Sequence, residues 1–183
     1  MTITINRRKL AFWGVLILVA AGLMVGAFWF RGQQTAAAAK ANAPVPPEQI
    51  VVAFTRDFYT LDYRDKTGWL AKLQPECTQD GYTFLNDMLT PLLWPQLTKS
   101  QSVTSAAQIT VKDNGLKALG QSNLGQWQIR AVSVTIAPEV KWPDAHEFDT
   151  NVLLGLENGA WKFGMFMDDA SADIYAQRAT PAP

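Results

Sequence analysis

The pattern of apolar and polar positions divides the chain into three parts. Residues 11–30 are uncharged and mostly apolar, without the polar stripe of a helix at a protein surface. Residues 31–47 are small and polar, with prolines at the end. From residue 48 the apolar positions recur with helical spacing, and after Ser102 they alternate as in strands. We therefore expect one folded domain, over residues 48–170, that follows an apolar segment and a linker.

The apolar segment has the length and the ends of a membrane-spanning helix. Its 20 residues would reach about 30 Å as a helix, the thickness of the hydrocarbon layer of a bilayer. Aromatic side chains stand at both ends, where membrane–water interfaces would lie: Phe12, Trp13, Phe28, Trp29 and Phe30. The alternative is an export signal cleaved near Ala41–Asn42–Ala43, although the apolar core of such a signal usually has about 7–15 residues. We expect residues 11–30 to be a permanent anchor.

Basic residues on either side of the anchor predict its orientation. Three of them, at positions 7–9, precede the segment, and fewer follow it. This excess favours a cytoplasmic position for residues 1–10. The domain would then lie outside the inner membrane, in the periplasm of a Gram-negative cell, tethered by the linker of residues 31–47. Residues 171–183, which end in "RATPAP", are expected to form a flexible tail.

Three helical stretches are predicted at the start of the domain. The first begins near Pro47–Glu48, because proline and an acidic residue suit a first turn. The second is a short helix and a turn within "DKTGWLAKLQPECT". The third has Thr78 or Asp80 as its N-cap, and Pro91 and Pro95 should bend or end it. Its apolar face is expected to hold Tyr82, Leu85, Met88 and Leu89.

The alternating pattern predicts three or four antiparallel strands. The first contains Ile109 and Val111. The second covers Gln126–Ile136, where the apolar positions change parity, and a bulge near Ala131 would explain the change. The last two form a hairpin, because Asn158–Gly159 can supply the positive φ angles of a type I′ turn. The pairs expected across this turn, all on the face that covers the core, are Leu156–Trp161, Leu154–Phe163 and Val152–Met165.

Helices followed by antiparallel strands predict an α+β fold. One long helix packed against a curved sheet suits the order of the elements and the length of the chain.

Composition and charge exclude several classes of function. Lysine plus arginine and aspartate plus glutamate each number 16, so the net charge of 0 gives no basic surface for nucleic acid. Cys77 and His146 are the only cysteine and histidine, which excludes an intramolecular disulfide and a zinc site built on several thiolates. Asp57, Asp62 and Asp65 have spacings that do not gather them on one helix face. We expect no enzyme, no catalytic residue, no cofactor and no metal, and Cys77 to be a packed, small apolar residue.

Tryptophans and an apolar stretch are the candidates for partner contacts. Four tryptophans in apolar patterns are expected to fill the core: Trp69, Trp94, Trp127 and Trp161. Trp142, beside Pro143, is a candidate anchor for a partner. The stretch Leu89–Leu97 is more apolar than an ordinary loop, and it either covers the mouth of the sheet or forms a contact patch. The candidate interaction residues are Leu93, Trp94, Leu97 and Trp142.

Short motifs carry a family resemblance. They are Phe58, Tyr59, Asp62 and Tyr63 in "FYTLDY", Thr78, Gly81 and Tyr82 in T-x-x-G-Y, and the closing "NGAWKF". With the N-terminal anchor, they resemble the DotI/IcmL family of inner-membrane components of type IV secretion and conjugation systems, to which conjugal TraM proteins belong. The resemblance extends over roughly residues 1–170. It implies a periplasmic domain with a nuclear-transport-factor-like fold that self-associates and contacts other subunits of the transfer channel.

Two alternatives remain open. The same fold can hold a ligand or an active site in its concave cavity, which would need a carboxylate such as Asp57 or Asp62 inside. An aromatic-filled cavity would favour assembly, and a buried aspartate with a raised pKa would favour the ligand site. The other alternative is an accessory protein of a different envelope transporter.

Overall fold

The computed structural model describes residues 45–122 and 125–178. The chain divides into two units, Met1–Ala43 and Pro44–Pro183, and the description concerns the second. The predicted anchor at residues 11–30 lies outside the described residues. Within the part that is described, no helix combines the length and apolar character needed to cross a bilayer.

The described residues form an α+β domain, as predicted. Its helical elements are α2 (Pro47–Tyr59), α3 (Lys66–Leu73), α4 (Gln79–Thr83), the π-helical turn η2 (Phe84–Leu89), α5 (Thr90–Ser100) and α6 (Asp169–Arg178), with two short 3-10 turns, η1 (Gln74–Glu76) and η3 (Ala106–Gln108). Its strands are β1 (Ile109–Ser122), β2 (Gly125–Ile136), β3 (Glu147–Glu157) and β4 (Ala160–Met167). The strands make one antiparallel sheet in the order β1-β2-β3-β4. The predicted curved sheet with a helix packed against it is therefore confirmed.

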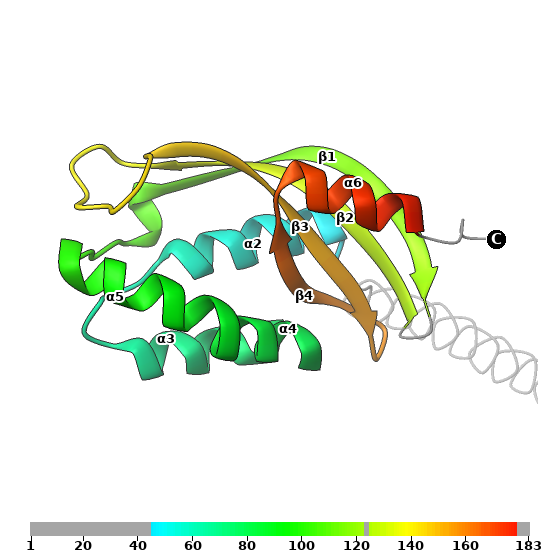
Figure 1. Cartoon of the computed structure of the whole chain (residues 1–183), viewed down its shortest axis with the longest axis horizontal. Helices are drawn as coiled ribbons and strands as arrows, with labels where there is room; N and C mark the ends of the chain where they lie inside the picture. Colours follow the sequence, from blue (N-terminus) through cyan, green and yellow to red (C-terminus); the bar gives the residue numbers. More distant parts are fainter. Residues whose placement is uncertain (1–44, 123–124, 179–183) are drawn as a thin grey trace, which may run out of the picture. The chain divides into compact units, whose positions relative to one another are not determined.

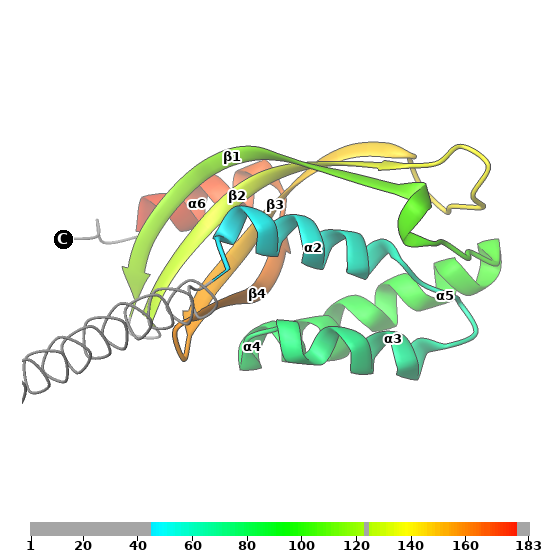
Figure 2. The ribbon, with the colours of Figure 1, turned by 180° about the vertical axis from the view of Figure 1, so that it is seen from behind.

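The helices are divided between the two faces of the sheet. The helix α2 lies on the concave face, with α3, α4 and α5 beyond it, whereas α6 lies on the opposite face (Figures 1 and 2). The larger core cluster lies between α2 and the sheet and includes Phe54, Phe58, Val132 and Phe163. A smaller cluster under α6 is built on Trp127 and other residues of the opposite face.

The prolines of the third helical stretch do not end it. Thr78 caps α4, because its Oγ1 accepts a hydrogen bond of 2.9 Å from the N–H of Gly81. The helix widens into the π turn η2 just before Pro91, and the N–H of Thr90 reaches back to the carbonyl of Leu85. This wider turn accommodates the proline, which has no N–H to donate. The helix then continues as α5 and ends where Gln101 adopts a left-handed φ of 57°.

The bulge expected in β2 is not there. Pairing of β2 with β3 runs without a shift from Trp127 to Thr135, and the register shifts of the β1–β2 ladder fall in β1. The change of apolar parity has another cause, since both faces of the sheet are covered. Trp127 and Ile129 belong to the cluster under α6, whereas Val132 and Val134 belong to the cluster under α2.

The predicted hairpin is confirmed, with one correction to its register. Asn158 and Gly159 have φ angles of 54° and 78°, and two of the expected pairs form: Leu156–Trp161 and Leu154–Phe163. The third is wrong, because Val152 pairs with Phe166 instead of Met165. The register shifts at Gly164, which has no partner in the ladder. The shift places Phe166 against the main core and Met165 against the cluster under α6.

The predicted flexible tail is wrong for its first residues, which belong to α6. The carboxylate of Asp168 accepts a hydrogen bond of 2.7 Å from the N–H of Ser171 and so caps the helix. Ala172 is fully buried, and the ring of Tyr175 meets Trp127 edge-on at 4.8 Å between centroids. Helix formation follows from this packing on the sheet, since the sequence of α6 has little amphipathic pattern of its own.

Candidate functional site

Aromatic rings fill the space between α2 and the sheet. Phe54 and Phe163 are fully buried and stack at 4.0 Å between ring centroids. Phe58 lies 4.7 Å from the ring of Phe166 and 5.3 Å from that of Trp69. The space between α2 and the concave side of the sheet is therefore occupied by packed aromatic rings.

A small apolar groove opens at the edge of this aromatic cluster, and we call it the α5 groove. Its volume is about 180 Å³. It is lined by Phe58 and Tyr59 of α2, Leu89, Leu93 and Gln96 of the η2–α5 helix, and Trp142, Pro143, Asp144 and Phe148. Ligand pockets usually measure about 300–1,000 Å³, whereas a cavity of about 150 Å³ holds a benzene ring. The groove therefore suits one apolar side chain better than a small-molecule ligand.

An exposed apolar ridge lies next to the α5 groove on the same helix. Met88 and Leu92, four residues apart, have 61% and 69% of their surface exposed. Each directly precedes a residue that lines the groove, Leu89 or Leu93. Neighbouring exposed apolar residues of this kind mark contact surfaces more often than isolated ones do. The ridge and the groove together form the candidate interaction site.

The structure brings two of the four predicted interaction residues together. Leu93 and Trp142 both line the α5 groove. Trp94 points inward, where its Nε1–H donates to the carbonyl of Tyr63 at 3.1 Å and its ring lies 5.3 Å from that of Trp69. Leu97 is fully buried, so its prediction as a contact residue is wrong.

Sequence reasoning missed the two residues of the ridge. Met88 was expected on the buried face of the helix, and Leu92 was not singled out. The π turn of Phe84–Leu89 is the reason. It has more residues per turn than an α-helix, so the residues within and after it point in directions that a regular 3.6-residue period does not predict. A regular helical pattern could not have predicted that shift.

Aromatic contacts hold the rim of the α5 groove in place. The ring of Tyr59 meets Trp142 edge-on at 5.8 Å and Phe148 at 5.4 Å. Burial, together with the nearby carboxylate of Asp144, raises the pKa of Tyr59 well above its ordinary value. Tyr59 is therefore a neutral part of the wall at neutral pH, and Asp144 is the charged residue of the lining.

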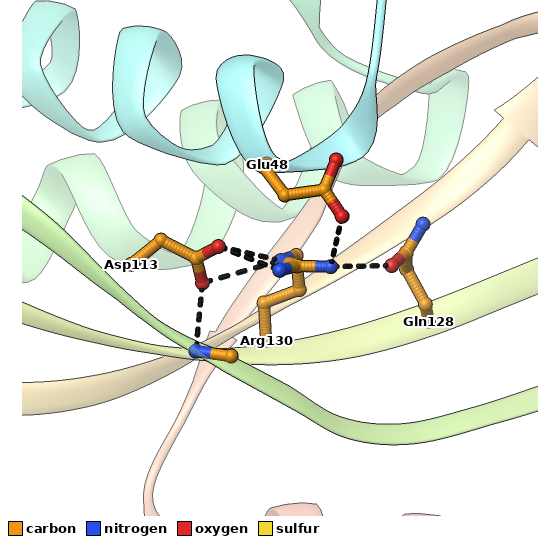
Figure 3. Close-up of polar contacts among 5 residues, drawn as sticks. Glu48, Asp113, Gln128 and Arg130 are labelled. Carbon is orange, nitrogen blue, oxygen red and sulfur yellow. Dashed lines mark hydrogen bonds and ion pairs between the residues drawn. The ribbon is translucent and has the colours of Figure 1, made fainter.

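A buried ion cluster at the other end of α2 was also missed (Figure 3). Arg130 of β2 has 7% of its side chain exposed. Its Nη2 lies 2.6 Å from a carboxylate oxygen of Asp113, and its Nη1 lies 2.9 Å from Glu48 and 3.3 Å from Oε1 of Gln128. The N–H of Gly115 also donates to Asp113 at 3.0 Å. The cluster joins the first turn of α2 to β1 and β2, so we interpret it as a clamp that holds the helix.

The three aspartates near α2 lie outside the aromatic cluster. Asp57 pairs with Lys72 at 2.9 Å, and Asp65 caps α3. Hydrogen bonds from Arg64 lower the pKa of Asp62 to about 2. These roles match the prediction that the three do not form one site. Among residues 45–122 and 125–178, no three His, Cys, Asp or Glu residues come together as metal ligands.

Cys77 is a packed thiol, as predicted. It is 4% exposed, and its Sγ donates to the carbonyl of Leu73 at 3.3 Å. Burial, with a smaller contribution from Glu76, raises the pKa of Cys77 to about 12. A thiol that resists ionisation in this way is a poor nucleophile.

The motif T-x-x-G-Y has a structural explanation. Thr78 caps α4, and its N–H also bonds to the carbonyl of Phe163 in β4 at 2.9 Å. A Cβ on Gly81 would lie 2.2 Å from that same carbonyl oxygen, so only glycine allows this close approach. The motif therefore docks α4 onto the sheet.

A second hollow, of about 380 Å³, lies beside α6. Trp127, Met165 and Tyr175 contribute to its lining, together with the carboxylates of Asp80 and Glu157. Its lining extends from the cluster under α6 to the start of α4 at Thr78 and Gln79, and it shares no lining residue with the α5 groove.

Comparison with known proteins leaves the family open. The sequence matches no protein-family model, and a search of curated proteins gives no significant match.

Proposed function

We propose that this chain is an inner-membrane-anchored assembly component of a type IV secretion or conjugative transfer channel, with a nuclear-transport-factor-like domain in the periplasm. The domain acts by contacting other copies of itself and other channel subunits. The observation that carries the proposal is the aromatic filling of the concave face, where Phe54, Phe58 and Phe163 are at most 2% exposed. A ligand-binding or enzymatic domain of this fold needs that space open.

The placement of charged groups supports the same proposal. Asp57, Asp62 and Arg130 are all paired with oppositely charged side chains. The alternative of a catalytic or ligand-binding cavity requires a carboxylate inside the concave cavity, whereas Asp57 and Asp62 lie outside the aromatic cluster and pair with Lys72 and Arg64. The α5 groove with its exposed ridge supports a role in protein contacts instead.

Anchoring explains how a modest contact surface suffices. Copies held in one membrane plane by residues 11–30 meet at a high effective concentration, so weak contacts between domains can build a ring or cluster. The linker of residues 31–47 sets how far each domain can reach.

The proposal is tested with the full-length chain in a Gram-negative cell. We expect the protein to remain with the inner-membrane fraction after alkaline carbonate extraction. The folded domain should be digested by protease added to spheroplasts but not to intact cells. A matched variant with Leu16→Arg and Val19→Arg, which places two charges in the anchor, should no longer be recovered in the membrane fraction. A wild-type chain found freely soluble, or a domain protected from protease in spheroplasts, would overturn the proposal.

A further inference from the structure

The α5 groove is a small hole, and the ridge of Met88 and Leu92 on the adjoining side of the same helix supplies a knob of matching apolar character. The hole, of about 180 Å³, takes one side chain. Leu92 is the most exposed large apolar residue described, at 69%, and it directly precedes Leu93 of the lining. The two residues are neighbours on one helix, so the knob of a copy cannot enter its own hole. Two copies related by a two-fold axis can exchange knobs, since such an interface uses the same patch twice.

We propose, building on the assembly function above, that two copies of this chain pair through this face around a two-fold axis. Their α5 helices run antiparallel, and Leu92 of each copy occupies the α5 groove of the other. Met88, one turn away, extends the apolar contact along the same helix.

The charges at the two ends of the helical surface favour the antiparallel arrangement. Asp87 stands just before the ridge and Lys99 near the end of α5, and both residues are exposed. They are 12 residues apart, about 18 Å along a helix. In an antiparallel pair with its axis near Leu93, Asp87 of one copy lies level with Lys99 of the other. A parallel pair would instead place like charges together, so these residues set direction more than strength.

The size of the contact explains why the anchor matters. Stable interfaces between free proteins bury about 1,200–2,000 Å², and one knob per copy with a narrow rim is a smaller contact. We therefore expect pairing to depend on the concentration of copies in the membrane plane. The formal net charge of 0 adds no long-range repulsion between copies.

Crosslinking of the full-length chain in phospholipid vesicles tests the geometry. Cys77→Ala first removes the native thiol, and Leu92→Cys then introduces one on the ridge. A short bis-maleimide should give covalent dimers in high yield. The matched control is Leu116→Cys, since Leu116 is 54% exposed but lies on β1. Crosslinking at position 116 equal to that at 92 would contradict the proposed face.

Substitutions test three features separately: the knob at Leu92, the α5 groove, and the antiparallel direction of the two helices. Association is measured by energy transfer between labelled chains at a fixed protein-to-lipid ratio. Leu92→Asp should weaken it at least tenfold, and Leu116→Asp should leave it unchanged. Leu93→Trp, which fills the groove, should weaken it similarly, and a mixture of the Leu92→Asp and Leu93→Trp chains should regain part of the signal. Lys99→Asp should weaken association a few-fold, and adding Asp87→Lys should restore it.

The outcomes separate this inference from the proposed function. If wild-type chains associate and folded Leu92→Asp chains associate equally well, the paired face is wrong, while assembly through another surface stands. If Leu92→Asp leaves self-association intact but abolishes crosslinking to a different envelope protein, the occupant of the groove is that partner and not a second copy. If wild-type chains do not associate at any density in vesicles, both this inference and the self-association in the proposed function fail. Circular dichroism of each variant verifies that its fold is intact.

Discussion

The two ends of α2 are attached to the sheet in different ways. At its C-terminal end, Phe54 and Phe58 enter a cluster of aromatic rings that excludes water. At its N-terminal end, Glu48 meets Arg130, which Asp113 also holds. Apolar packing depends little on salt, whereas an ion pair with a half-exposed partner is screened by it. The C-terminal, or inner, end of α2 is thus held by apolar packing, and its N-terminal, or outer, end is held by ion pairs, one of which salt can weaken.

The largest expected effect on stability comes from removing the aromatic ring of Phe54 at the inner end of α2. Phe54→Ala leaves a cavity against Phe163 and should lower the free energy of unfolding by about 3–5 kcal/mol. Urea denaturation followed by tryptophan fluorescence measures it. Phe54→Leu, which keeps most of the volume, should cost clearly less. A loss under about 1 kcal/mol for the alanine variant would show that the rings are not closely packed.

The next effect comes from the ion pair of Arg130 with Asp113, the buried part of the cluster at the outer end of α2. Arg130→Met removes the partner of Asp113, whose side chain is only 15% exposed, and should cost about 2–4 kcal/mol because a carboxylate is left without its counter-ion. The control is the double variant Arg130→Met with Asp113→Leu, which removes both charges and should regain most of the stability. Equal losses in the single and double variants would show that the cluster acts through packing and not through charge.

A smaller effect is expected from Glu48, the more exposed partner of Arg130 at the outer end of α2. Glu48→Gln should cost about 0.5–1 kcal/mol, since the Glu48 side chain is 52% exposed and water screens its charge. The difference from wild type should shrink in 1 M salt, where the screening length falls to about 3 Å. Hydrogen exchange should become faster in the first turn of α2 and stay unchanged near Phe58. An unchanged first turn would mean that Glu48 does not hold the helix.

The last prediction concerns Cys77, which has the smallest effect on stability at neutral pH because its thiol is protonated there in both the folded and the unfolded chain; in alkali it tests how strongly the interior opposes charge. Burial raises the pKa of Cys77 from an ordinary 9.0 to about 12, so at pH 8 the folded protein should have far less thiolate than an unfolded chain. Reaction with a maleimide should be slow until denaturant is added. Between pH 9 and 12 the unfolded state loses this proton first, so the contribution of Cys77 to stability is present below pH 9 and is lost as the pH rises. Cys77→Ala should remove that part of the alkaline loss, and rapid labelling of the native protein at pH 8 would contradict the burial.

Much of the architecture followed from local patterns in the sequence. Asn158–Gly159 determined a turn because few other residue pairs adopt positive φ angles so readily, and Thr78 determined a helix start because its hydroxyl satisfies a free N–H. The order of helices and strands determined the α+β class. These features depend on neighbours along the chain, and the chain alone therefore specifies them.

Tertiary structure decided which face of each element is buried. The parity change in β2 reflects a helix, α6, that packs on the second face from far along the chain, and Arg130 is buried because Asp113 and Glu48 reach it from other elements. The π turn before Pro91 set which of Leu92, Trp94 and Leu97 points outward, and so it created the candidate interaction site. Burial and pairing arise between distant segments, and the free energy they contribute does not exist until those segments meet.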